Sequence, residues 1–222
     1  MNFTLEQIEA MMSMQDSLNK RLAADWALKS WNWKHAIIDE CMEVHGHLGW
    51  KWWKDTSQYK VGITAENRKQ VQLEVVDIWH FIMSWAIDYR YSPDEVAKEL
   101  KNPTRTGNIY CEVDRLMAFA ATNNIPINQF ASLMHESGLT GQELYEIYVG
   151  KYALNRFRWD HGYDDGTYMK HWLVPAVSIM SHEDNWFLEL ILFDLRQNSI
   201  EVTAAKVELA LTNYYSAVTG GK

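Results

Sequence analysis

The sequence has few of the residues that turn the chain or break helices: 4 prolines and 11 glycines in 222 residues. Folds made of many short strands need turn residues at regular short spacing, so this scarcity argues against a β-sandwich or a barrel. Short runs of alternating β-branched residues are also missing. The sequence therefore predicts an all-α fold.

Cysteine and basic residues are scarce as well. Cys41 and Cys111 lie far apart without a CxxC pair, which argues against a disulfide framework and a structural zinc site, and a reducing intracellular setting is the default. Lysine and arginine number 21 against 29 acidic residues, giving a net charge of −8. Because this charge repels nucleic acid and acidic membrane surfaces, we expect neither as a partner.

Long apolar runs are absent too. The longest charge-free stretch runs from Leu116 to Met134, but Asn123, Pro126 and Asn128 interrupt it, which predicts a buried segment with a turn rather than a membrane helix. The acidic first twenty residues do not resemble a signal peptide. We therefore expect a cytoplasmic location.

Helical signals follow one another along the chain without a low-complexity linker or a clear repeat, so we expect one domain over residues 1–222. Thr4 with Gln7 and Thr140 with Glu143 resemble capping boxes, and Ser92-Pro93 with Glu95 adds a first-turn proline. Helices are expected at roughly 5–22, 33–47, 64–89, from 93, 109–123, 127–137, 140–158, 182–197 and 201–217, with a loop from Lys101 to Gly107.

Aromatic residues are abundant, with 11 Trp, 11 Tyr and 7 Phe. Such side chains either fill a core or line a flat pocket that stacks a planar ligand. Composition does not distinguish the two interpretations, so the positions of the aromatic residues in the chain must decide between them.

Two acidic pairs stand beside apolar stripes. In the second expected helix, Glu40 and Glu43 share a face next to the stripe of Ile37, Cys41 and Val44. In the third, Glu74 and Asp77 flank the stripe of Val71, Val75, Ile78, Ile82 and Trp85. An acid beside a buried stripe is costly unless it is paired or bound to a metal.

Four clustered carboxylates repel one another, so bringing the two helices together requires a cation. Oxygen ligands without cysteine suit Mg²⁺. Two alternatives remain: four solvated surface acids, or a zinc site of Glu43, His45 and His47. The zinc site is disfavoured because histidines two residues apart diverge on a helix.

Positive charge and aromatic rings gather in two other segments. Trp50-Lys51-Trp52-Trp53-Lys54 follows the first acidic helix, and Lys151, Arg156, Arg158 and Lys170 surround a glycine-bearing loop. Lysine and arginine meet phosphate oxygens, and rings stack on a base. Together with the acids, these segments suit a ligand made of metal, polyphosphate and base, although a solvated helix end would also explain the basic loop.

These motifs resemble the dimeric dUTPases of the all-α NTP pyrophosphatase superfamily, found in some bacteria, kinetoplastids and phages. The resemblance runs from Gln15 to about Trp172. The ExxE and ExxD pairs are shared with MazG-like relatives, whereas the WKWWK, His80-Phe81 and KYxLNxFR segments (the last from Lys151 to Arg158) are more specific.

The resemblance implies a homodimer that hydrolyses dUTP, and usually dUDP, to dUMP. It implies that Glu40, Glu43, Glu74 and Asp77 bind Mg²⁺, with Mn²⁺ as a substitute. Glu40 and Glu43 are the expected catalytic residues, and Glu40 is preferred for positioning or deprotonating the attacking water. The stretch from 90 to 145 has no residue-by-residue match and is expected to form a mobile helical cap and part of the dimer interface.

The resemblance to the dimeric dUTPases also implies which residues contact the nucleotide. Expected nucleotide-binding residues are Gln15, Asn19, Trp52, His80 and Asn155. Expected phosphate-binding residues are Lys54, Lys151, Arg158 and Lys170. If the protein comes from a phage, the host cytoplasm is its expected location.

Two rival functions stay open. A related phage-type enzyme would act on dCTP as well as dUTP, because an amide such as Asn155 carries both a donor and an acceptor and could flip to suit cytosine. The other rival is a non-enzymatic helical binding protein, in which the four acids are solvated surface residues without a catalytic role.

Overall fold

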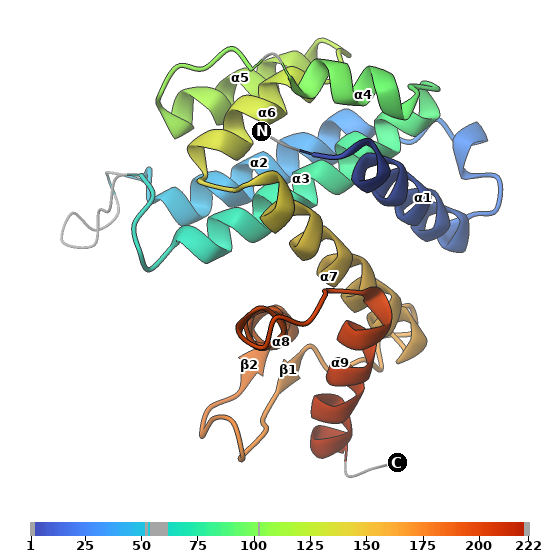
Figure 1. The fold of residues 1–222 in the computed structure, drawn as a ribbon, viewed down its shortest axis with the longest axis vertical. Coiled ribbons are helices and arrows are strands. Elements are labelled where there is room, and N and C mark those ends of the chain that lie inside the picture. The colour runs from blue at the N-terminus through green and yellow to red at the C-terminus, as the bar shows by residue number, and fades with distance from the viewer. Residues whose placement is uncertain (1–2, 52, 54–61, 102, 220–222) are drawn as a thin grey trace. The chain divides into compact units, whose positions relative to one another are not determined.

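The computed structural model describes residues 3–51, 53, 62–101 and 103–219. Apart from one ladder of two short strands, the regular structure of these residues is helical, which confirms the all-α prediction (Figure 1). The chain divides into two compact units, Met1–Tyr145 and Glu146–Lys222. No helix in the described ranges has both the length and the apolar character needed to cross a membrane.

The first unit is a bundle of helices whose starts follow the capping signals. It contains α1 (Leu5–Leu22), the 3₁₀ turn η1 (Trp26–Leu28), α2 (Trp33–Leu48), α3 (Arg68–Asp88), α4 (Pro93–Leu100), α5 (Ile109–Ala121), α6 (Ile127–Glu136) and the start of α7 (Gly141–Asp160). The Thr4–Gln7 and Ser92–Glu95 capping boxes both form, with Pro93 in the first turn of α4. Thr140 and Glu143 form a third capping box through reciprocal hydrogen bonds between side chain and backbone.

The third helix begins at Arg68, four residues later than expected. Residues 65–67 form a turn instead. The Asn67 side chain donates to the carbonyl oxygens of His47 (2.9 Å) and Gly62 (3.0 Å), which ties this turn to the end of α2. Gly49 ends α2 in a left-handed conformation (φ 72°), where glycine carries no Cβ penalty.

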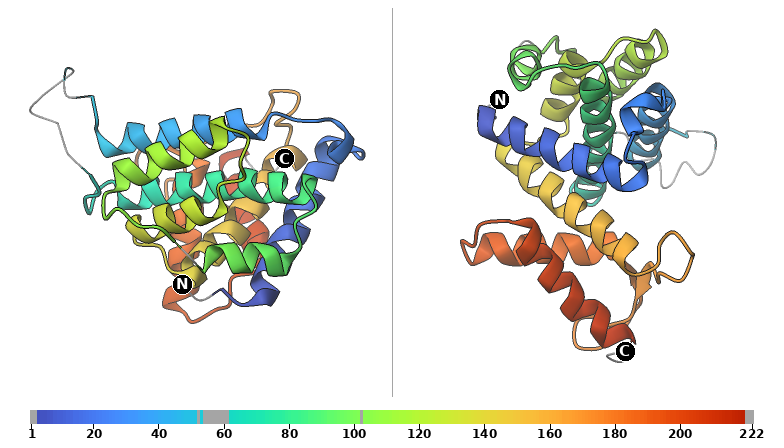
Figure 2. Two further views of the ribbon diagram at one scale, coloured as in Figure 1. Left: turned by 90° about the horizontal axis from the view of Figure 1, so that it is seen from above. Right: turned by 90° about the vertical axis from the view of Figure 1, so that its right-hand side faces the viewer.

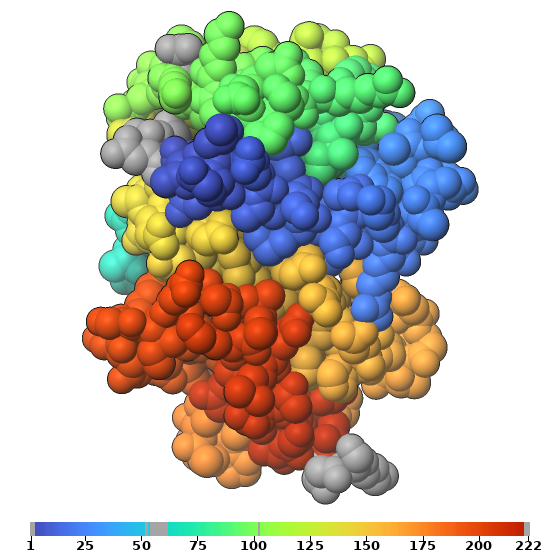
Figure 3. Space-filling view, turned by 45° about the vertical axis from the view of Figure 1, so that its right-hand side comes forward, coloured from blue at the N-terminus to red at the C-terminus, as the bar shows by residue number. Residues whose placement is uncertain are grey.

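Helices α2 and α3 lie side by side at the centre of the first unit and run in opposite directions (Figure 2). Their facing apolar stripes are fully buried, including Ile37, Val44 and Ile78. Around them, α1 and α6 pack on α3, and α5 packs on α2. Figure 3 shows α1 and α4 next to each other on the surface of this unit.

Aromatic residues fill much of the first unit's core. Trp79 is fully buried and stacks on Phe130, with ring centroids 4.5 Å apart. For these residues the core-filling interpretation of the aromatic content is therefore correct.

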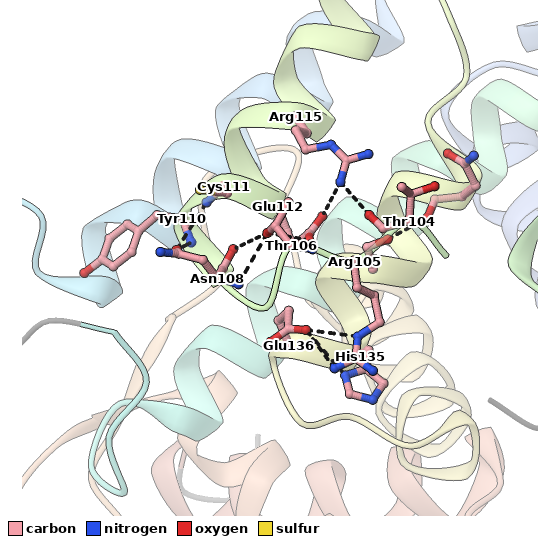
Figure 4. Close-up of polar contacts among 12 residues, drawn as sticks. Thr104, Arg105, Thr106, Asn108, Tyr110, Cys111, Glu112, Arg115, His135 and Glu136 are labelled. Carbon is pink, nitrogen blue, oxygen red and sulfur yellow. Dashed lines mark hydrogen bonds and ion pairs between the residues drawn. The ribbon is translucent and has the colours of Figure 1, made fainter. Parts of the chain in front are cut away.

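The loop between α4 and α5 is fastened to α5 and α6 (Figure 4). Glu112 is fully buried and accepts hydrogen bonds from the backbone N–H and the hydroxyl of Thr106, the latter at 2.7 Å, while Arg115 lies 3.4 Å away. Arg105 donates to Oε1 of Glu136 from both Nε (3.1 Å) and Nη2 (3.0 Å). This region falls inside the expected cap, whose movement remains a prediction.

The second unit contains the rest of α7, a two-residue antiparallel ladder, and two helices. The ladder pairs β1 (His171–Trp172) with β2 (His182–Glu183), and α8 (Asp184–Gln197) and α9 (Ala204–Thr219) follow. The sequence had predicted helix from 182 onward, but residues 182 and 183 pair with β1 and α8 begins at Asp184. Trp172 is the centre of this unit's core, with ring centroids 5.0 Å from Phe187 and 5.3 Å from Tyr215.

Candidate functional site

An acidic cluster lies between α2 and α3. One carboxylate oxygen from each of Glu40, Glu74 and Asp77 lies within 4.8 Å of the other two. Glu74 is only 8% exposed, and the other two are half-buried. The cluster forms because the ExxE helix and the ExxD helix run antiparallel with their apolar stripes in contact, which turns both acidic pairs toward the same seam.

Glu43 lies at the edge of this cluster. Its side chain is exposed and does not belong to the close group of three oxygens. Desolvation raises the pKa of its carboxyl group, and the negative charges of Glu74, Asp39 and Asp77 raise it further. Of the four predicted metal ligands, Glu40, Glu74 and Asp77 therefore converge closely. Glu43 lies near enough for the charges of Glu74 and Asp77 to raise its pKa.

Histidine enters the site from the same face of α2. Nε2 of His47 lies 3.3 Å from Oε1 of Glu74, and this hydrogen bond is the main cause that raises the pKa of His47. His45 points elsewhere and lies 3.1 Å from Asp114 on α5. Because the two histidines diverge, the geometry does not favour the zinc alternative of Glu43, His45 and His47.

A buried polar network joins α1 to α3 in the same unit. Nδ1 of His80 lies 2.7 Å from Oε1 of Gln15, and Gln15 donates to Oδ1 of Asn19 (3.2 Å). Asn19 in turn donates to the hydroxyl of Ser84 (3.0 Å), which donates to the carbonyl oxygen of His80 (3.0 Å). Each of these four side chains is at most 5% exposed. Three predicted nucleotide-binding residues are thus brought together by the fold.

Ser84 was not among the predicted residues, although a signal for it exists. It follows His80 by four positions, so both side chains lie on one face of α3. A helical projection that included hydroxyl groups would have found it.

The tryptophan segment is only partly described. The rings of Trp50 and Trp53 pack edge to face with centroids 5.2 Å apart, and the Trp50 ring lies 6.1 Å from that of His45. Trp53 is 52% exposed. Trp52 and Lys54, predicted to contact base and phosphate, lie outside the described residues.

In the second unit, the predicted ligand residues of α7 contact the first turn of α8. Lys151 is 4% exposed and donates to Oδ1 of Asn185 (3.3 Å). Arg158 forms a two-pronged ion pair with Asp184, with Nε to Oδ2 at 2.7 Å and Nη2 to Oδ1 at 2.8 Å. Nη1 of Arg158 also donates to Oδ1 of Asn155 (3.2 Å). Lys151, Asn155 and Arg158 therefore share one face of α7.

Lys170 is more exposed and forms an ion pair with Glu183 at 3.3 Å. Asp184 and Asn185 were missed by the sequence analysis, which found only helical character after residue 172. No local pattern could have identified Asp184, because its partner Arg158 lies 26 positions earlier.

No curated protein matches the chain. A protein-family model does: the model described as dUTPase matches residues 7–163. The matched range includes the acidic cluster, the Gln15–His80 network and the polar face of α7. Since it spans well over half of the 222 residues, the chain belongs to the dUTPase family of the all-α type, and its activity is that of a dUTP diphosphatase.

Proposed function

We propose that this enzyme hydrolyses dUTP, and also dUDP, to dUMP with Mg²⁺ bound by Glu40, Glu74 and Asp77 and with Glu43 as the fourth acidic ligand. The observation that carries the proposal is the convergence of three carboxylate oxygens within 4.8 Å. At this spacing the negative charges repel, and the repulsion is strongest where Glu74 is buried. A hard divalent cation with a preference for oxygen ligands suits such a donor set.

Bound Mg²⁺ would supply charge neutralisation at the phosphates. Besides holding the ion, one acid of the first pair would position the attacking water or accept its proton. Glu40 is the preferred residue for this role. Glu43 is the second catalytic candidate, because it lies one turn from Glu40 on the same face of α2.

The buried network would hold the deoxynucleoside. Gln15, Asn19 and His80 already restrain one another, so little side-chain freedom remains to be lost when a ligand binds. Asn155 would contact the edge of the base, and Trp52 would stack on its face. The network, the helix seam and the α7 face are all parts of the range matched by the family model.

Basic residues would neutralise the phosphates. Lys54, Lys151, Arg158 and Lys170 are proposed for this role. Lys151 lies on the same face of α7 as Asn155, the proposed contact of the base edge, and its buried ammonium group donates to Asn185.

The decisive experiment is a nucleotide panel of dUTP, dUDP, dCTP, dTTP and UTP, assayed with Mg²⁺, with Mn²⁺ and with excess chelator. We expect dUTP to give dUMP and pyrophosphate, dUDP to give dUMP and phosphate, and both reactions to stop with chelator. Equal cleavage of dCTP and dUTP would replace the proposal with a dual-specificity enzyme. Full activity in the chelator would refute the metal assignment.

The base contact has its own test. Asn155→Ala should lose selectivity for uracil over cytosine, because the groups that distinguish the two bases lie on the edge that Asn155 would contact. Unchanged selectivity in this variant would move base recognition to Gln15 or to main-chain groups.

A further inference from the structure

The side-chain amide of Asn155 is held in one orientation by Arg158. Oδ1 of Asn155 accepts a hydrogen bond from Nη1 of Arg158 at 3.2 Å. A guanidinium group has only donors, so the oxygen and not the NH₂ group of the amide must face it. A flip of the amide would set N–H groups against N–H groups.

Arg158 is itself held in place. Its Nε and Nη2 atoms bind the two oxygens of Asp184 at 2.7 and 2.8 Å, the fork-to-fork geometry of a strong ion pair. Because the guanidinium is planar, these two bonds also fix the direction of Nη1. Asp184 is fully buried, and the Arg158 side chain is 14% exposed, so water competes little for either group.

Two further contacts restrain Asp184. The hydroxyl of Tyr168 donates to its Oδ2 at 2.8 Å, and the Asp184 backbone N–H donates to the carbonyl oxygen of Lys170 at 2.9 Å. Burial raises the pKa of the Tyr168 phenol, and the charge of Asp184 raises it further, so the phenol keeps its proton and remains a donor. The chain Tyr168–Asp184–Arg158–Asn155 thus lies entirely within the second unit and has a donor and an acceptor matched at each step.

We propose that Asp184, through Arg158, is a positioning residue that makes the enzyme selective for uracil over cytosine by preventing Asn155 from flipping. The proposal rests on the proposed function, in which Asn155 contacts the base edge. In the held orientation Asn155 offers its NH₂ group as a donor and a second lone pair of Oδ1 as an acceptor. Uracil presents the complement, a carbonyl oxygen at position 4 and an N–H at position 3.

Cytosine presents the opposite pattern, an amine at position 4 and a bare nitrogen at position 3. It would pair with Asn155 only after the amide flips, and the flip would break the bond to Arg158. A freely rotating Asn155 amide could pair with uracil or with cytosine, whereas the amide held by Arg158 pairs with uracil only. On this proposal the enzyme is specific for uracil, and the dual-specificity alternative becomes an outcome of the test.

The test compares the binding of dUMP with that of dCMP by isothermal titration calorimetry, which does not depend on turnover. The parent protein should bind dUMP at least about 100-fold more tightly than dCMP. In Asp184→Asn, Arg158 loses its charged anchor, and the ratio of the two dissociation constants should fall at least about tenfold. Glu208→Gln is the matched control. It weakens the ion pair between Glu208 on α9 and Arg156 (3.5 Å), which lies on α7 as Arg158 does, and it leaves the contacts of Asn155 unchanged.

Arg158→Lys is the second variant, in case Asp184→Asn does not fold. It keeps the positive charge but cannot bind Asp184 with two prongs and Asn155 with a third donor, so the ratio should fall in the same way. Glu208→Gln should keep the parent ratio. A merely structural role for Asp184 would weaken both nucleotides equally and leave the ratio unchanged, and that result would overturn the proposal.

A parent protein that binds dCMP as tightly as dUMP would also overturn it. Failure of the proposed function would have a different signature. A parent protein without Mg²⁺-dependent turnover would contradict the catalytic assignment. The ratio of the dUMP and dCMP dissociation constants in parent and variants would still show whether Arg158 fixes the orientation of the Asn155 amide.

Discussion

His47 on α2 lies 3.3 Å from Glu74 on α3, so a basic side chain meets the most buried acid of the cluster across the seam between the two helices. Glu40, about two turns before His47 on α2, also approaches α3, with one carboxylate oxygen within 4.8 Å of one from Glu74 and one from Asp77. The fold therefore creates the acidic cluster without relying on a loop.

The acidic cluster makes the first prediction. Glu40→Gln, Glu74→Gln and Asp77→Asn should each reduce kcat/KM for dUTP by more than about 100-fold, because each removes a charged ligand of the proposed Mg²⁺ site. Glu43→Gln should also lose most turnover. Without added metal, the melting temperature of each variant should equal or exceed that of the parent, since one repulsive charge is gone.

Asp39→Asn is the matched control for this series. Asp39 lies next to Glu40 on α2 but is exposed and outside the cluster of three oxygens. It should keep near-normal turnover. If two or more of the cluster variants behave like this control in a steady-state assay, the metal-site assignment is wrong.

The two cysteines give the second prediction. Cys41 is fully buried, and burial raises the pKa of its thiol, with the charges of Glu40 and Asp114 adding to the effect. The reactive thiolate is therefore scarce at neutral pH. Cys111 is exposed. Iodoacetamide treatment of the native protein should add one carbamidomethyl group, located on Cys111 by peptide mass spectrometry, and modification of Cys41 should require denaturation.

The third prediction concerns the loop before α5. Glu112→Ala should lower the free energy of unfolding by about 3 kcal/mol, because Thr106 and Arg115 lose the buried carboxylate that they contact. Arg105→Ala should cost less than about 1 kcal/mol, since its pair with Glu136 is more exposed. Urea denaturation of both variants measures the difference, and equal losses would show that Glu112 is not the stronger anchor.

Oligomeric state is the fourth prediction. We expect a homodimer, and sedimentation equilibrium at micromolar concentration should return twice the 26.0 kDa mass of the chain. Obligate interfaces are large and apolar, and the helices after Cys111 are rich in apolar and aromatic residues. A single species at the monomer mass would contradict the expected dimer.

The sequence by itself determined the helices and which residues share a face of each. The capping boxes at Thr4, Ser92 and Thr140 and the glycine at position 49 are local signals, because the hydrogen bonds that they form span only a few residues. The spacing of Glu40 with Glu43 and of Glu74 with Asp77 is likewise local. These patterns were enough to predict an all-α fold and an acidic seam between two helices.

Tertiary structure decided which of these residues meet and what holds them. The close approach of Glu40 to Glu74 and Asp77, the contact of Gln15 with His80, and the hold of Asp184 on Arg158 all join positions far apart in the chain. The short β1–β2 ladder was missed for the same reason, because each strand is only two residues long and is stabilised by its partner rather than by its own sequence. Periodicity assigns a side chain to a face of its helix, but only the packing of one helix on another determines what that face touches.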